Sequence, residues 1–183
     1  NILDPLALNT SGFEGGNVSI TTSGTGTVTI SSIDISGAIL PGGSFTANVG
    51  GAMQAPGIST IASNFGNAGA IAITAAGNIT LSGNLTSTGY DSGGSISVIS
   101  TGGTVTGLNV LSNSSGPTGG GSIINISGQA VNMGSLDSDG SSVSATATSG
   151  NLTTGYVYSG YLGAGAINLI ATGDILAGEV SAS

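Results

Sequence analysis

Chemistry in this chain would depend on carboxylates and hydroxyls, because its 183 residues include no Lys, Arg, His or Cys. Asp137 and Asp139 in "SLDSDGSS" lie two residues apart, which places both on one face of an extended segment. Paired carboxylates can hydrolyse glycosides, whereas most other acid–base sites need His, Lys or Arg. A two-carboxylate glycosidase is therefore the only enzyme class left open. We favour a solvated turn that ends at Gly140, and we expect no enzyme.

The same segment partly resembles a calcium-binding loop. Such a loop requires a bidentate acid at its twelfth position, and counting Asp137 as the first residue puts Thr148 there. Asp137 and Asp139 are therefore candidates only for adventitious calcium binding. The sequence predicts no other metal site and no cofactor.

The stretch "GYVYSGY" suggests binding rather than catalysis. If Val157 faces inward on a strand, Tyr156 and Tyr158 point outward on one face. Exposed paired tyrosines supply contact area at a low entropic cost, so they are a candidate surface for carbohydrate or protein. The alternative, which we favour, is a ladder of side chains packed on neighbouring segments of the chain.

The elements that must position these residues recur along the chain. A Gly precedes a short alternating segment seven times, at intervals of 22 to 26 residues: Gly26, Gly51, Gly77, Gly103, Gly128, Gly150 and Gly173. A second landmark, small residues followed by alternating apolar ones, keeps step with the first, as in "GGSISV" and "AGAINLI". Seven repeats of roughly 25 residues with three short strands each predict an all-β chain, a parallel β-helix or solenoid of about seven coils. We expect residues 1–183 to form a single domain.

Within a repeat, apolar and polar residues alternate as they do in half-buried strands. In residues 67–91 the expected inward side chains are Ile71, Ile73, Ile79, Leu81 and Leu85. Their burial contributes about 8–15 kcal/mol, whereas ordering the backbone of one repeat costs about 25–50 kcal/mol, so single coils must stack to fold. Strands this short do not suit an outer-membrane barrel, and a sandwich would not impose this repeat.

The composition excludes several partners. A formal net charge of -8 with no cationic side chain cannot neutralise phosphates, so we expect no nucleic-acid partner. An anionic membrane surface is a poor partner for the same reason, and no run of about 18 apolar residues predicts membrane insertion. A mean hydropathy of +0.41 with 4% charged residues indicates a folded chain rather than a disordered one.

Two stretches, "GNITLSGNLTSTGYDSGGSISV" and "GAINLIATGDILAGEVSAS", resemble the repeats of filamentous-haemagglutinin-type exoproteins, which are large secreted bacterial surface proteins. The resemblance extends over nearly the whole chain and rests on the style of the repeat. It implies a right-handed β-helix, export by a partner transporter, and a role in adhesion, biofilm formation or surface filaments. The expected location is extracellular, at the cell surface. No basic-then-apolar leader starts at Asn1, so we expect any secretion signal to have been removed or to lie outside this sequence.

Apolar residues lie near both ends of the repeat array, and neither end shows a polar cap. The candidate assembly residues are Leu3, Leu6 and Leu8 at one end and Ile175, Leu176 and Val180 at the other. Both ends fall at nearly the same phase of the repeat, as open-ended stacking requires. The sequence therefore predicts the structural subunit of an extracellular filament, with further copies of itself as partners.

Other interpretations of the same residues remain open. An excised piece of a longer solenoid would show similar ends, and an adhesin fragment would use the face of Tyr156 and Tyr158. An ice-binding face would repeat a T-x-T pair on every coil, and such pairs occur only at Thr27 with Thr29 and at Thr104 with Thr106.

Overall fold

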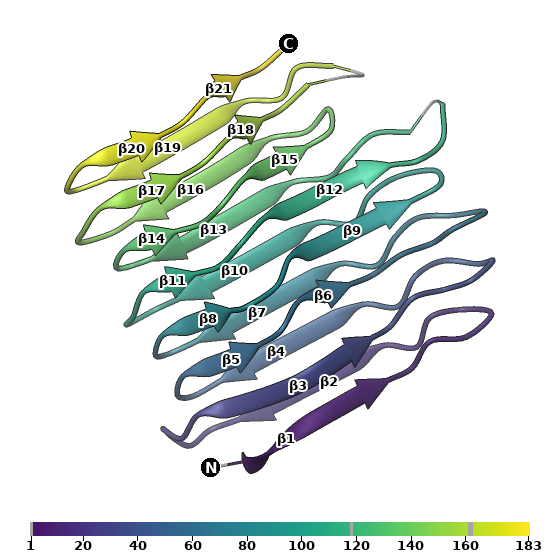
Figure 1. Cartoon of the computed structure of the whole chain (residues 1–183), viewed down its shortest axis with the longest axis horizontal. Helices are drawn as coiled ribbons and strands as arrows, with labels where there is room; N and C mark the ends of the chain where they lie inside the picture. The colour runs from purple at the N-terminus through teal and green to yellow at the C-terminus, as the bar shows by residue number, and fades with distance from the viewer. Residues whose placement is uncertain (1, 118, 161–162) are drawn as a thin grey trace.

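The computed structural model describes residues 2–117, 119–160 and 163–183, and the side chains of these residues from residue 7 onward. In this part of the chain 21 strands pair in parallel and form three sheets. Successive coils stack in chain order, so that the first and last coils lie at opposite ends of a rod (Figure 1). The prediction of an all-β solenoid with about seven coils of about 25 residues is confirmed.

Each regular coil gives one strand to each sheet, as β7, β8 and β9 do. The seven-stranded sheet contains β2 (Val18–Thr22), β4 (Phe45–Val49), β7 (Ile71–Ala75), β10 (Ile96–Ser100), β13 (Ile124–Gly128), β16 (Val143–Ala147) and β19 (Ile167–Ala171). The eight-stranded sheet contains β1 (Ile2–Asn9), β3 (Val28–Asp34), β5 (Met53–Ala55), β8 (Ile79–Leu81), β11 (Val105–Thr106), β14 (Val131–Asn132), β17 (Leu152–Thr154) and β20 (Ile175–Ala177). The six-stranded sheet contains β6 (Ile58–Ser59), β9 (Leu85–Gly89), β12 (Val110–Ser114), β15 (Leu136–Ser138), β18 (Val157–Tyr158) and β21 (Val180–Ser181).

The core is a set of apolar columns that run along the rod. All five side chains expected to face inward in residues 67–91 are buried. One column consists of residues paired from coil to coil: Val18, Phe45, Ile71, Ile96, Ile124 and Val143. Burial alternates along these strands because successive side chains point to opposite faces of a sheet. Stacking thus joins the small apolar set of each coil into one continuous core.

The strand β3 departs from the three-strand plan. It runs unbroken through "VTISSID", whereas later coils place two strands in the equivalent stretch, as β8 and β9 do around Gly83. No Gly interrupts "VTISSID", so nothing in the sequence forces a corner there.

Buried hydroxyl groups form a ladder inside the six-stranded sheet. Its members follow the inward apolar residue of each strand by two positions: Thr60, Ser87, Ser112, Ser138 and Ser159. Ser87 Oγ donates to the carbonyl oxygen of Gly69 at 2.9 Å and accepts from the N–H of Gly94 at 2.8 Å. Ser112 Oγ does the same with the carbonyl oxygen of Gly94 and the N–H of Ser122. Each hydroxyl of this ladder therefore satisfies backbone groups of the loops that lead into the seven-stranded sheet.

Those loops contain glycines stacked coil upon coil. A Cβ atom on Gly69 would overlap the carbonyl group of Gly43, and one on Gly94 would overlap that of Gly69. Gly43 stands in the same relation to Gly16. The backbones approach so closely here that only a residue without a side chain fits.

Asparagine side chains connect coils at other corners. Asn78 Oδ1 accepts from the N–H of Thr104 at 2.9 Å, and Asn151 Oδ1 accepts from the N–H of Asp174 at 3.0 Å. The expectation that Asn78 and Asn151 hydrogen-bond along a column of corners is confirmed.

Candidate functional site

The face of the last coil exposes residues of the inward-facing type. Ile175 pairs with the buried Leu152, and Val180 pairs with the buried Val157, yet they are 47% and 50% exposed because no described coil follows them. The strands β19, β20 and β21 are also the last members of their sheets. This face, which we call the C-terminal face, therefore combines apolar side chains with unpaired strand edges.

The position of Leu176 differs from the sequence prediction. It pairs with Thr153, which faces outward, so Leu176 continues an outward row and is 66% exposed on the side of the rod. The sequence "ILA" has apolar residues at consecutive positions, and a period of two cannot decide which of them faces inward. Ile167 and Leu169, which sequence reasoning missed, do lie on the C-terminal face, because they pair with the buried Val143 and Ala145.

The opposite face is formed by the strands β1 and β2. Leu8 pairs with Ile33 and packs against the core, and Leu6 pairs with the buried Ile30. The side chains of Leu3 and Leu6 lie outside the described residues. The pairing of β1 is irregular between Ile2 and Leu6, and Pro5 in this stretch has no N–H to donate. Residues 6–9 therefore form the regular part of this edge.

Leu8 and Val180 occupy the same position in the repeat. Leu8 pairs with Ile33, and parallel bridges four residues further on, Gly12 to Gly37 and Gly37 to Ala62, keep the same step. From Ile58 the column continues through Leu85, Val110, Leu136 and Val157 to Val180. The described coils thus begin and end in phase.

The tyrosine pair lies on the outer surface of the six-stranded sheet. Val157 is fully buried, whereas Tyr156 and Tyr158 are half-buried on the opposite side of the strand. Their rings are stacked, with centroids 5.7 Å apart and planes 15° apart. The predicted outward orientation on one face is confirmed.

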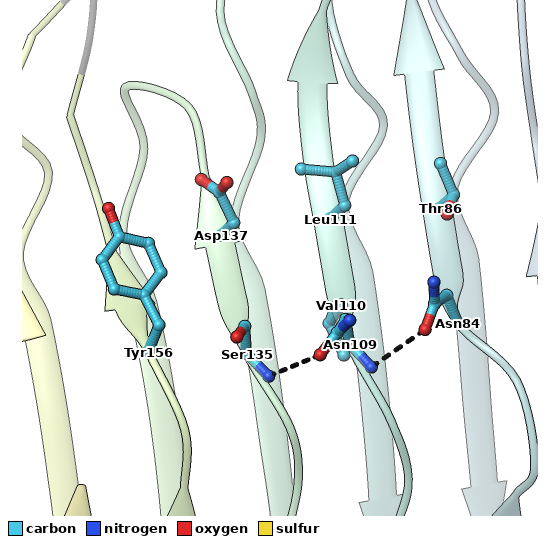
Figure 2. A pocket seen from close by; sticks show the side chains of 8 residues that line it. All are labelled: Asn84, Thr86, Asn109, Val110, Leu111, Ser135, Asp137 and Tyr156. Atoms are coloured by element: carbon cyan, nitrogen blue, oxygen red, sulfur yellow. Dashed lines mark hydrogen bonds between the residues drawn. The ribbon is translucent and has the colours of Figure 1, made fainter. Parts of the chain in front are cut away.

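A shallow pocket of about 300 Å³ lies beside Tyr156. Its lining comes from four consecutive coils: Asn84, Thr86, Asn109, Val110, Leu111, Ser135, Asp137 and Tyr156. Figure 2 shows the Tyr156 ring, the Asp137 carboxylate, and the Leu111 and Thr86 side chains side by side across these coils. Sequence reasoning missed this pocket, although its residues share two repeat positions, the ones directly before and after an inward apolar residue.

The two acidic residues considered for catalysis or calcium binding are partly buried and lie on consecutive elements. Asp137 is on the strand β15, and Asp139 begins a turn in which Gly140 has a φ of 92°. The predicted turn at Gly140 is therefore present. The described residues bring no third His, Cys, Asp or Glu to this pair. Burial raises the pKa of Asp137, the nearby Asp139 raises it further, and burial raises the pKa of Asp139 as well.

This electrostatic environment predicts a pH-dependent stability. Because its pKa is raised by folding, the folded protein holds the proton of Asp137 more tightly than the unfolded chain does. Its contribution to stability is complete below the unfolded pKa of about 3.9 and is lost as the pH rises through the folded pKa. Asp137→Asn removes the cost of the buried charge, so we expect it to raise the melting temperature at pH 7 but not at pH 3, as measured by circular dichroism.

Asp34 provides the control of opposite sign. The Ser36 hydroxyl and the Ser36 N–H donate to its carboxylate, at 2.8 and 3.3 Å, and lower its pKa. Asp34→Asn should therefore lower the melting temperature at pH 7, and the difference should shrink as the pH falls towards the folded pKa. An identical pH response of the two variants would contradict this assignment of charges.

Apolar residues also line one lateral edge of the first four coils, a feature that sequence reasoning missed. Phe13, Ile39, Leu40, Phe65 and Tyr90 are exposed there. The N–H groups of Ile39 and Leu40 donate to the carbonyl oxygen of Phe13, and the rings of Phe65 and Tyr90 lie 6.0 Å apart. Their spacing of 25 to 27 residues was the available signal, because residues one repeat apart stack on one another.

The geometry defines a β-solenoid with exposed end faces and a polar, tyrosine-flanked pocket on its side. Comparison of the chain with protein-family models, with curated proteins and with solved structures finds no match. The described residues contain no helix that is long and apolar enough to cross a membrane.

Proposed function

We propose that this protein is a structural subunit of an extracellular filament, in which one β-solenoid stacks head to tail on the next. The observation that carries the proposal is the C-terminal face, where Ile175 and Val180 are half-exposed in the register of a buried column. A coil seated on them would bury apolar area and pair the open strand edges at the same time.

A second copy of the chain fits this role because of phase. Leu8 and Val180 occupy the same repeat position, so a copy with Leu8 over Val180 would continue the apolar column and the parallel ladder without a break. Such a contact joins two different faces and does not close on itself, so it generates a filament rather than a ring. The regular residues 6–9 of β1 and the strand β2 would form the other half of the contact.

Charge sets the conditions for assembly. Each copy carries a formal net charge of -8 with no compensating cation, so copies repel one another at low ionic strength. At 0.15 M salt the screening length falls to about 8 Å, which weakens this repulsion while leaving apolar burial intact. We therefore expect filaments to lengthen between 10 and 150 mM NaCl.

Negative-stain electron microscopy over a concentration series tests the proposal. We expect filaments of the parent chain and only single rods of the double variant Leu8→Asp, Val180→Asp, because both charges would be buried in the contact. Leu108→Asp is the matched control, since Leu108 is exposed between the ends of the rod. It should assemble as the parent does.

Two results would overturn the proposal. One is monodisperse rods of the parent at every concentration and salt, which would mean that other coils cover these faces. The other is filaments that persist in the double variant, which would mean that the contact lies elsewhere.

A further inference from the structure

The pocket beside Tyr156 has a lining unlike the rest of the rod surface. It combines an aromatic ring, a carboxylate, two primary amides and two hydroxyls, contributed by Tyr156, Asp137, Asn84, Asn109, Thr86 and Ser135. These groups lie on four consecutive strands, which the parallel ladder holds rigidly (Figure 2). Its volume of about 300 Å³ is at the small end of the range for ligand pockets, which suits one or two small rings.

The orientation of the two amides follows from their backbone contacts. The N–H of Asn109 donates to Asn84 at 3.2 Å, and the N–H of Ser135 donates to Asn109 at 2.9 Å (Figure 2). A backbone N–H can only donate, so the atom that each contacts is the amide oxygen. The NH₂ groups of both residues form no hydrogen bond within the described part of the chain, and each remains as a fixed donor.

The Asp137 carboxylate supplies acceptors to the same pocket. It receives no hydrogen bond from the described residues, and the chain has no Lys, Arg or His that could neutralise it. A partly buried carboxylate is costly unless donors reach it, so a ligand that brings donors gains from this position. The negative charge also disfavours an anionic ligand.

We infer that this pocket binds a neutral carbohydrate, with a sugar ring over Tyr156 and hydroxyl groups on Asp137 and the two asparagines. Hydroxyls both donate and accept, so they match the carboxylate and the amide NH₂ groups together. An ammonium group only donates and would leave the amide donors unmatched. The apolar C–H face of a pyranose packs on an aromatic ring, and the stacked Tyr158 holds the ring of Tyr156 in place.

Binding of immobilised oligosaccharides, measured by biolayer interferometry, tests the inference. The probes are the neutral hexamers of glucose (β-1,4 and α-1,4 linked), xylose and mannose, with hexagalacturonate as the acidic probe and chitosan hexamer as the cationic one. We expect saturable binding of at least one neutral hexamer and none of the charged ones. All measurements use the Leu8→Asp, Val180→Asp chain alongside the parent, so that the outcome does not depend on filament formation.

Point variants then locate the binding site. Tyr156→Ala should weaken binding at least tenfold, Tyr156→Phe should keep most of it, and Asp137→Asn should weaken it several-fold. Tyr90→Ala is the matched control, because Tyr90 lies on another edge of the rod, and it should bind as the parent does. Melting temperatures of all variants show that the fold is retained.

The inference is overturned if no neutral hexamer binds, if a charged hexamer binds in preference, or if Tyr156→Ala binds as well as the parent.

Discussion

Gly69→Ala will lower the free energy of unfolding by about 2–3 kcal/mol, because its Cβ atom would overlap the backbone carbonyl group of Gly43. The overlap is with backbone rather than with a flexible side chain, so two coils must move apart to relieve it. The same carbonyl-lined corner holds the acceptor for Thr60 and Ser87, so the movement also weakens two buried hydrogen bonds. For a chain of this size the expected fall in melting temperature is about 5–10 °C.

The control for this prediction is Gly24→Ala. A Cβ atom on Gly24 would meet nothing within 4 Å, so alanine should be neutral there or stabilise by up to about 1 kcal/mol through the unfolded state. Thermal and urea unfolding of both variants, followed by circular dichroism, measures the difference. Equal effects at the two positions would mean that the stacked glycines do not limit how closely the coils approach.

Phe45→Ala should destabilise the protein by about 3–5 kcal/mol, the largest effect we expect from a single side chain. Phe45 is fully buried and pairs with Val18 on one side and Ile71 on the other, so its removal opens a cavity in the column near the first coils. Because stability in a stacked array depends on contacts between neighbouring coils, the first coils should separate from the rest before the global transition.

Phe65→Ala is the matched change of an exposed phenylalanine, which is 64% exposed at the lateral edge. It should alter stability by less than about 0.5 kcal/mol. Hydrogen exchange provides the second measurement, since Phe45→Ala should speed exchange in β2 and β4 more than in β13 and β16. Uniform acceleration throughout the rod would contradict a coil-by-coil structure.

Much of this architecture could be predicted from short-range patterns. Alternation placed Ile71, Ile73 and Leu85 inward, because the period of a strand is two and one face of every strand is buried. The spacing of glycines gave the length of a coil, since each coil turns its corners at equivalent residues. The same spacing placed Val157 level with Leu85 and Val180, and thereby the two tyrosines outside.

Other features depend on contacts between coils, which no local pattern encodes. Leu176 was placed inward because two adjacent apolar residues satisfy a period of two in either phase. The pocket beside Tyr156 escaped prediction because equivalent positions hold different residue types, from Asn84 to Ser135. The buried hydroxyls were taken as water-facing, since Ser and Thr on strands are usually exposed.

The hydroxyl ladder has a consequence for how the chain avoids misfolding. Neighbouring coils have similar sequences, and sliding one along the next by two residues would preserve the inside–outside alternation, so apolar burial alone discriminates weakly against that slip. The slip would move Ser87 and Ser112 away from the carbonyl groups they satisfy and set them against Leu and Val. Two buried polar groups would then lose their partners at every step, at about 1–3 kcal/mol each. The polar atoms at the centre of the rod therefore act as alignment marks that select the correct register from near-equivalent ones.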